Sequence, residues 1–347
     1  MIKVVLAFVL VTMIVIPAEA STIEAPEVFD SGRQIMPQNT ESFGEGVLEI
    51  LQNAMNLLRP NLREAAESCC VVIFSAMLFS ALPLISQRIN AMASVAGTTV
   101  IATVMLRQTG SMVSLATDTV RNILEYGKLL CQVMTTALAA QGSISASSAL
   151  YIGTAAFIAV LNSLLSRVII PMIFIYLAFA VAYGSCGDEF LKKNADLIKG
   201  SLIWILKILL IIFTSYMSIT GVVSGTTDLA SLKTAKILFS SAVPVVGGIL
   251  SDSSEAVLVS MGFIKNTAGI YGMLAVLSMF AGPFIRIGMH FLMLKVSAAL
   301  CAVFGDKQIS SLADSFSAAM SLLMAVIASG CVLILISTIC FLKGAAS

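Results

Sequence analysis

Six ionisable residues and a helix-breaking segment fall together in one apolar stretch, residues 226–266. Ionisable residues at membrane depth mark candidate functional sites. Pro244, Gly247 and Gly248 disfavour an uninterrupted helix. We therefore predict a helix–break–helix hairpin that faces the protein interior and acts in gating or docking. Its candidate residues are Asp228, Lys233, Lys236, Pro244, Gly247, Gly248, Asp252, Glu255, Lys265 and Asn266.

The alternative for this stretch is an interfacial loop between two ordinary spans, and the sequence leaves it open. Outside the stretch, the single histidine, His290, lies in an apolar run, where a packed or hydrogen-bonded side chain is expected rather than a proton relay. The seven cysteines are scattered without a C-x-x-C pair and are typical of small buried hydrophobes. With no catalytic pairing, metal cluster or phosphate loop, we expect no enzyme, no cofactor and no metal.

Composition places the chain in a membrane. Of its 347 residues, 58% are hydrophobic and 11% are charged, whereas a soluble domain carries about 25% charged residues. The sequence predicts an all-α, polytopic helical membrane protein with about six to eight spans. A clustered basic surface, which nucleic-acid binding requires, is not visible in the sequence.

The amino-terminal region resembles an export signal followed by a polar leader. Residues 1–20 combine a short apolar core with an A-x-A site, so we expect cleavage between Ala20 and Ser21, with an uncleaved anchor as the alternative. Residues 21–68 carry eight acidic and three basic residues, a net charge of −5. We interpret them as an exported, flexible leader. Its helical periodicity near residues 47–62 predicts either an amphipathic helix on the membrane surface or a small packed helix.

Residues 69–347 form the expected multi-pass membrane domain. Its apolar segments are residues 69–85, 91–106, 149–165, 168–183, 201–223, 269–281, 283–304 and 318–342. Residues 112–140 are amphipathic and carry Asp118, Arg121, Glu125 and Lys128. An exported amino terminus places Arg88 in the cytoplasm, and the two Gly-Asp loops, which begin at Gly187 and Gly305, also face the cytoplasm if the hairpins are re-entrant or if both of their arms cross. Lys192, Lys193 and Lys199 fit the positive-inside rule there, whereas Arg107, Arg121 and Lys128 fit it poorly.

The membrane domain contains an apparent internal repeat, residues 112–223 and 224–342. The segment at 187–206 aligns with the segment at 305–324, and both contain Gly-Asp followed by Ala-Asp at the same spacing. The two Ala-Asp pairs end at Asp196 and Asp314. Internal repeats are common in transporters, which place their sites at the repeat interface.

The run KTAKILFSSAVPVVGGILSDSSEAVLVSMGFIKNTAG, residues 233–269, resembles the signature region of the stage III sporulation protein AE family. The export signal, acidic leader, length and span pattern extend this resemblance over essentially the whole chain. The resemblance implies a spore-forming Firmicute and a mother-cell protein in the membrane that surrounds the forespore. The leader would then lie between the two membranes.

The same resemblance implies a part in a channel complex required for endospore formation. The partners would be proteins of the same operon and a forespore membrane protein. The family is also described as a permease, and it brings no established catalytic residues. We expect a transport or structural component of the channel. The alternative is an autonomous secondary transporter with a site at the repeat interface.

Overall fold

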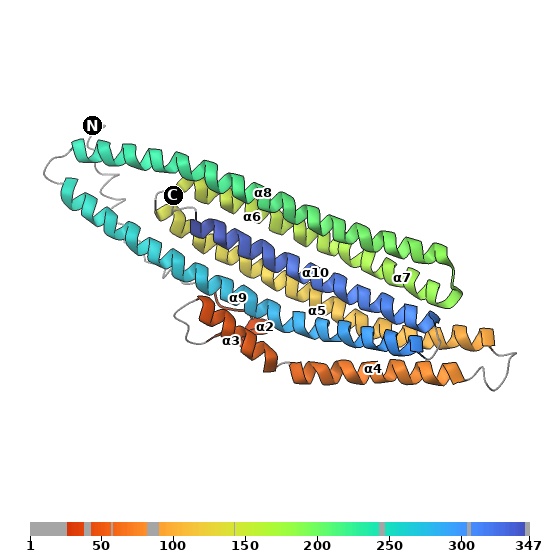
Figure 1. Ribbon diagram of the computed structural model, residues 1–347. Coiled ribbons are helices and arrows are strands. Elements are labelled where there is room, and N and C mark those ends of the chain that lie inside the picture. Colours follow the sequence, from red (N-terminus) through yellow and green to blue (C-terminus); the bar gives the residue numbers. More distant parts are fainter. Residues whose placement is uncertain are drawn as a thin grey trace.

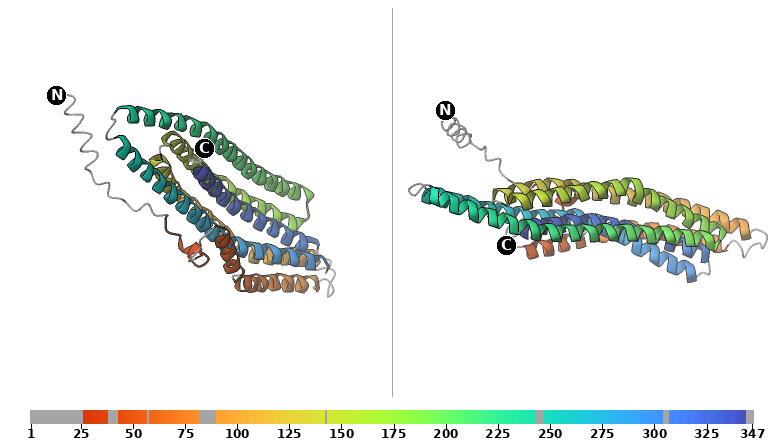
Figure 2. Two further views of the ribbon diagram at one scale, coloured as in Figure 1. Left: turned by 60° about the vertical axis from the view of Figure 1, so that its left-hand side comes forward. Right: turned by 90° about the horizontal axis from the view of Figure 1, so that it is seen from above.

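The computed structural model is a bundle of long helices that run side by side (Figures 1 and 2). It describes residues 26–37, 43–56, 58–81, 90–141, 143–242, 247–303 and 307–343, which contain no strand. The elements are α2 (Asp30–Arg33), α3 (Phe43–Asn56), α4 (Leu58–Ala81), α5 (Asn90–Ala140), α6 (Ile144–Leu164), the π-helix η2 (Leu165–Ile169), α7 (Ile170–Cys186), α8 (Glu189–Ala242), α9 (Gly247–Val303) and α10 (Lys307–Lys343).

Four helical segments within the described residues are long and apolar enough to cross a membrane. They are Ile144–Cys186, Glu189–Thr220, Asn266–Val303 and Gln308–Lys343. Large apolar side chains such as Phe174, Trp204 and Ile211 are exposed on their outer faces, which lipid tolerates. The expected all-α membrane fold is confirmed. The expected number of spans agrees only approximately, because several predicted spans are joined into longer helices.

Two expected boundaries are absent from the backbone. Ser166 and Arg167, which were expected to separate two spans, lie in η2, so α6 and α7 form one continuous 43-residue segment. Pro283 lies inside α9 rather than at a helix start. Proline removes one backbone donor, but neighbouring helices and local adjustments compensate for this loss within membrane bundles. Polar residues and proline are therefore weaker helix boundaries here than the sequence indicated.

The amino-terminal segment is packed against the bundle. A Cβ at Gly32 would lie 2.7 Å from Met279 Cγ of α9, and the Phe29 ring lies edge-on to Tyr126 of α5 with centroids 6.5 Å apart. The expectation of a flexible leader is therefore wrong for residues 26–37. Tight contact with α9 and α5 orders this segment, a feature that its polar composition did not reveal.

Helix α3 packs against the bundle, as one of its two predicted alternatives requires, and contact of its exposed side with the membrane surface stays a prediction. Ile50 packs with Leu274 of α9 in a small apolar cluster, while Leu48 and Leu51 on the other side remain exposed. The helix ends at Asn56, and Pro60 falls in the first turn of α4. Proline is tolerated there because the first helical N–H groups have no intrahelical partner.

Candidate functional site

The predicted hairpin corresponds to the junction of α8 and α9. Helix α8 ends at Ala242 and α9 begins at Gly247, so two helical arms meet at the predicted break. Pro244 lies outside the described residues. Only the backbone is described for residues 221–242 and 247–265, which include the other candidates except Asn266. Asn266 is exposed. The roles of these side chains remain predictions.

The tip of this hairpin projects from the bundle. The Ala242 end of α8 and the Gly247 end of α9 extend beyond the neighbouring ends of α6 and α10 (Figures 1 and 2). The described helices therefore do not enclose the backbone of the tip. The interior-facing position of its side chains and their gating or docking role stay predictions.

A second candidate site is a cleft of about 660 Å³ near the opposite end of α8. Helices α7, α8, α9 and α10 each contribute to its walls. The lining residues are Tyr176, Ala180, Tyr183, Lys192, Ala195, Asp196, Lys199, Lys295, Ala298, Ala299, Ala302, Ser310, Ser311, Asp314, Ser315 and Ala318. The volume falls within the range of small-molecule sites, roughly 300–1,000 Å³. Small alanine side chains leave this space open.

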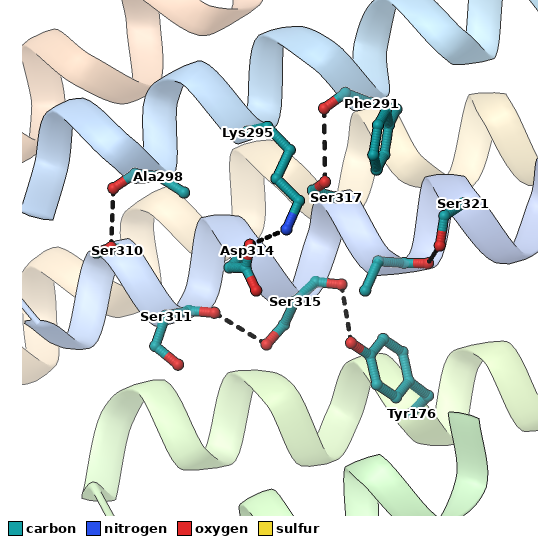
Figure 3. A network of polar contacts seen from close by, with 11 residues as sticks. Tyr176, Phe291, Lys295, Ala298, Ser310, Ser311, Asp314, Ser315, Ser317 and Ser321 are labelled. Atoms are coloured by element: carbon teal, nitrogen blue, oxygen red, sulfur yellow. Dashed lines mark hydrogen bonds and ion pairs between the residues drawn. The ribbon is translucent and has the colours of Figure 1, made fainter. Parts of the chain in front are cut away.

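One wall of the cleft is held by polar contacts between helices. Lys295 of α9 forms an ion pair with Asp314 of α10 (Figure 3). The Tyr176 hydroxyl of α7 donates a 3.0 Å hydrogen bond to the Ser315 carbonyl, and the Ser310 hydroxyl donates a 2.8 Å hydrogen bond to the Ala298 carbonyl. These contacts fix α7, α9 and α10 relative to one another.

The other wall presents charges from one face of α8. Lys192, Asp196 and Lys199 are spaced four and three residues apart, which places them on the same side of a helix. Lys192 Nζ lies 5.6 Å from the centroid of the Tyr183 ring, a distance at which a cation–π attraction operates. The cleft can therefore offer both ammonium and carboxylate groups to a polar solute.

The Gly-Asp pair before α8 has a structural role. Gly187 has φ = 71° and ends α7 in the left-handed conformation, which glycine adopts without a Cβ penalty. Asp188 Oδ1 then accepts a 2.9 Å hydrogen bond from the Phe190 N–H, as an N-cap residue does. The pair turns the chain sharply and thereby brings α8 back along α7.

Asp196 and Asp314, equivalent in the predicted repeat, line the same cleft. The repeat pattern aligns them in the sequence, but neither aspartate was predicted as a site residue. Their equivalence was the signal that could have found the cleft, because sites of transporters lie at repeat interfaces. The repeat itself remains a prediction.

A third charged region is the outward face of α5. Asp118, Arg121, Glu125 and Lys128 are all exposed, whereas Val120 on the inner side is fully buried. We call these four residues the charged face of α5. The amphipathic pattern predicted for residues 112–140 is thus present on a helix whose other side packs into the core.

The charged face belongs to a helix that packs against the Gln308–Lys343 candidate span. A Cβ at Gly330, near the middle of the Gln308–Lys343 span, would lie 3.4 Å from Val120. A Cβ at Gly127 would lie 2.2 Å from Ile334 of the same span. A charge that faces lipid near the bilayer centre costs about 2.5–3.5 kcal/mol on insertion scales. Contact with water or with another polar surface removes most of that cost.

Buried polar contacts join the remaining helices. His290 is 1% exposed, and its Nδ1 lies 2.8 Å from the Gln108 amide nitrogen, so the expected packed and hydrogen-bonded histidine is confirmed. Thr154 and Ser337 hydroxyl oxygens lie 2.7 Å apart, and Cys131 Sγ lies 3.6 Å from Ser337. Such contacts link helices where lipid provides no hydrophobic driving force.

Comparison with known proteins agrees with the membrane architecture. The family model for stage III sporulation protein AE matches residues 34–344. A curated relative, stage III sporulation protein AE of Bacillus subtilis (strain 168), is 24% identical over 217 residues. This alignment covers 62% of the chain and 54% of the relative, so it spans about half of the relative's length. No solved structure gave a significant match. Because the family model covers most of the sequence, the chain belongs to the stage III sporulation protein AE family.

Proposed function

We propose that this chain is a multi-pass membrane component of the channel complex between mother cell and forespore, with a transport or structural role in endospore formation. The observation that carries the proposal is the family match over residues 34–344, on a chain with four helical segments that can cross a membrane. In this proposal the protein lies in the mother-cell membrane around the forespore. Its partners are proteins of the same operon and a forespore membrane protein.

The projecting α8–α9 hairpin supports a docking role within such a complex. Its tip extends beyond the other described helices (Figure 1), and the sequence places six ionisable residues along its two arms. Exposed charges at an interface guide the choice of partner and the speed of association. We assign the hairpin to contact with a partner protein, with Gly247 and Gly248 allowing close backbone approach.

The proposal is tested by purifying a tagged copy of the full chain from sporulating cells of its own host. Mass spectrometry of the material that co-purifies with the tagged chain should find the operon partners. Cells that lack the chain should lose spores, and the tagged copy should restore them. Full spore yield without the chain, or a functional tagged copy that purifies alone, would contradict the proposal.

The cleft at the predicted repeat interface favours a second candidate, an autonomous secondary transporter. Solute sites of transporters lie in such places, and the cleft offers ammonium, carboxylate and hydroxyl groups. The purified chain in liposomes distinguishes the two functions. A transporter takes up solute without partners, whereas a channel component needs the other proteins of its complex.

A further inference from the structure

We propose that the cleft between α7, α8, α9 and α10 binds the headgroup of an anionic phospholipid, with the lipid phosphate against Lys192 and Lys199. The site binds a component of the membrane, and it does not depend on the proposed role in a channel complex. It gives the cleft an occupant different from the solute of a transporter.

The cleft carries more positive than negative charge. Its charged lining residues are three lysines and two aspartates: Lys192, Lys199, Lys295, Asp196 and Asp314. Lys295 and Asp314 pair with each other. The recorded ion pairs of the described residues include neither of the two α8 lysines nor Asp196. Even if Asp196 neutralises one lysine of its own helix, the other lysine keeps its charge.

A single phosphodiester matches this excess of one positive charge. Lysine ammonium groups bind phosphate as point charges, and basic pockets between membrane helices bind the headgroups of anionic lipids. A zwitterionic headgroup brings a positive charge of its own and leaves the excess uncompensated. The charge of the cleft therefore favours an anionic phospholipid over a zwitterionic one.

A hydroxyl group on the α10 wall can donate to the same phosphate. Ser311 lines the cleft on the same side of α10 as Asp314 and Ser315 (Figure 3). The Ser311 carbonyl accepts a 2.9 Å hydrogen bond from the Ser315 hydroxyl. Within the described part of the chain, the Ser311 hydroxyl itself has no recorded hydrogen bond. It remains a donor for an oxygen atom of the ligand.

The cleft lies near one end of the candidate spans, where headgroups are found. Lys199 is ten residues after the start of the Glu189–Thr220 span, and Lys295 is eight residues before the end of the Asn266–Val303 span. A span of 38 residues is about 57 Å long, whereas the apolar layer of a bilayer is about 30 Å thick. When such a span crosses a membrane, its end turns extend into the headgroup layer. Lysine side chains can also reach toward that layer along their flexible stems.

An exposed apolar stripe on α9 runs beside the cleft. It consists of Val296, Leu300 and Val303, which are all exposed. Each of them directly follows a residue that lines the cleft, so the stripe lies about 100° around the helix from the cleft wall. An acyl chain can pack on this stripe while its headgroup occupies the cleft. A soluble phosphate would not use the stripe, which favours a lipid as the source of the phosphate.

Native mass spectrometry of the purified full chain in detergent tests the site. The chain is titrated with phosphatidylglycerol, which is anionic, and in parallel with phosphatidylcholine, which is zwitterionic. Phosphatidylglycerol should bind at least about tenfold more tightly. Replacing both α8 lysines, Lys192→Gln with Lys199→Gln, should weaken its binding about 30-fold, because each lysine contributes about fivefold near an anionic lipid.

Lys193→Gln is the matched control. Lys193 is exposed on the same helix but does not line the cleft, so its replacement should leave lipid binding unchanged. Ala302→Phe is an independent variant, because it narrows the cleft without removing a charge, and it should also weaken binding. Thermal unfolding without added lipid is measured for every variant, so a folding defect is detected separately.

Three results would overturn the proposal. The first is wild-type affinity for phosphatidylglycerol in both the double glutamine variant and Ala302→Phe, and the second is equal affinity of the wild type for the two lipids. Inorganic phosphate provides the third arm and should leave the lipid bound even in large excess. Displacement of the lipid by inorganic phosphate, with the same dependence on the two lysines, would assign the cleft to a soluble anion instead.

Discussion

The cleft and the charged face of α5 differ in how their charged side chains are paired. In the cleft, Lys295 and Asp314 from two helices pair within the chain, and Tyr176 bonds across to Ser315 (Figure 3). On α5, by contrast, Asp118 accepts a hydrogen bond from the Ser114 hydroxyl and Arg121 donates one to the Ser166 hydroxyl, and both charged side chains are exposed. Ion pairing between helices thus joins the walls of the cleft within one molecule, whereas the α5 charges face the surroundings of the chain.

The comparison depends on α5 lying against the candidate span in α10, so breaking that contact has the largest expected effect. Gly127→Leu inserts a side chain where even a Cβ would lie 2.2 Å from Ile334. Overpacking of a core costs about 1–3 kcal/mol, occasionally more, so membrane abundance and spore yield should both fall. Gly110→Leu is the control on the same helix, since a Cβ there meets no described atom within 4 Å. Equal abundance of both variants, measured by immunoblot, would show that α5 packs elsewhere.

The α8–α9 hairpin offers a third region to compare, because its tip is not packed in the described bundle. Gly248→Leu in this hairpin should reduce spore yield more than membrane abundance. Leucine would hinder the close backbone approach that glycine permits, without removing any core contact of the described bundle. Gly200→Leu is the control on α8, because a Cβ there meets no described atom within 4 Å. Spore counts and membrane immunoblots are measured together. Loss of protein in parallel with loss of spores would assign Gly248 a purely structural role.

Asp252→Asn should have a smaller effect, with impaired sporulation at near-normal membrane levels. The amide keeps the size of the side chain but removes the charge that docking or gating would use. Co-purification of partners should weaken in step with spore yield. Wild-type spore yield and partner recovery at normal abundance would exclude a role for this carboxylate.

Breaking the Lys295–Asp314 ion pair should have the smallest effect, a small loss of folding stability. Their side chains are 47% and 56% exposed, and such exposed pairs are worth about 0.2–1 kcal/mol. A double-mutant cycle with Lys295→Gln and Asp314→Asn, read by thermal unfolding in detergent, should give a coupling of that size. A coupling several times larger would mean that the cleft is more enclosed than the α7–α10 geometry indicates.

Helical periodicity and apolar runs predicted most of the fold. They could not predict that residues 149–183 continue through Ser166 and Arg167, because a π-helix and tertiary packing accommodate those polar residues. They also missed the packing of residues 26–37. There Gly32 allows the chain to approach Met279 closely, and a contact between positions so distant in sequence leaves no local pattern.

The candidate sites show the same limit. Charge density in the sequence identified the α8–α9 hairpin, but its side chains lie outside what the structure describes. The cleft combines Tyr176 with Asp314 and Ser315, and only three-dimensional packing brings them together. The four charges of α5 were visible as an amphipathic pattern. Their position on a helix beside the α10 candidate span became evident only from the contacts of Val120 and Gly127 with α10.

The central claim is that this chain acts as one component of a membrane protein complex. A tagged full-length copy, expressed at native level in sporulating cells, tests it most directly. The account predicts that purification through the tag recovers partner proteins from solubilised membranes, and that Asp252→Asn reduces this recovery. A tagged copy that supports full spore yield and yet purifies alone would contradict the claim.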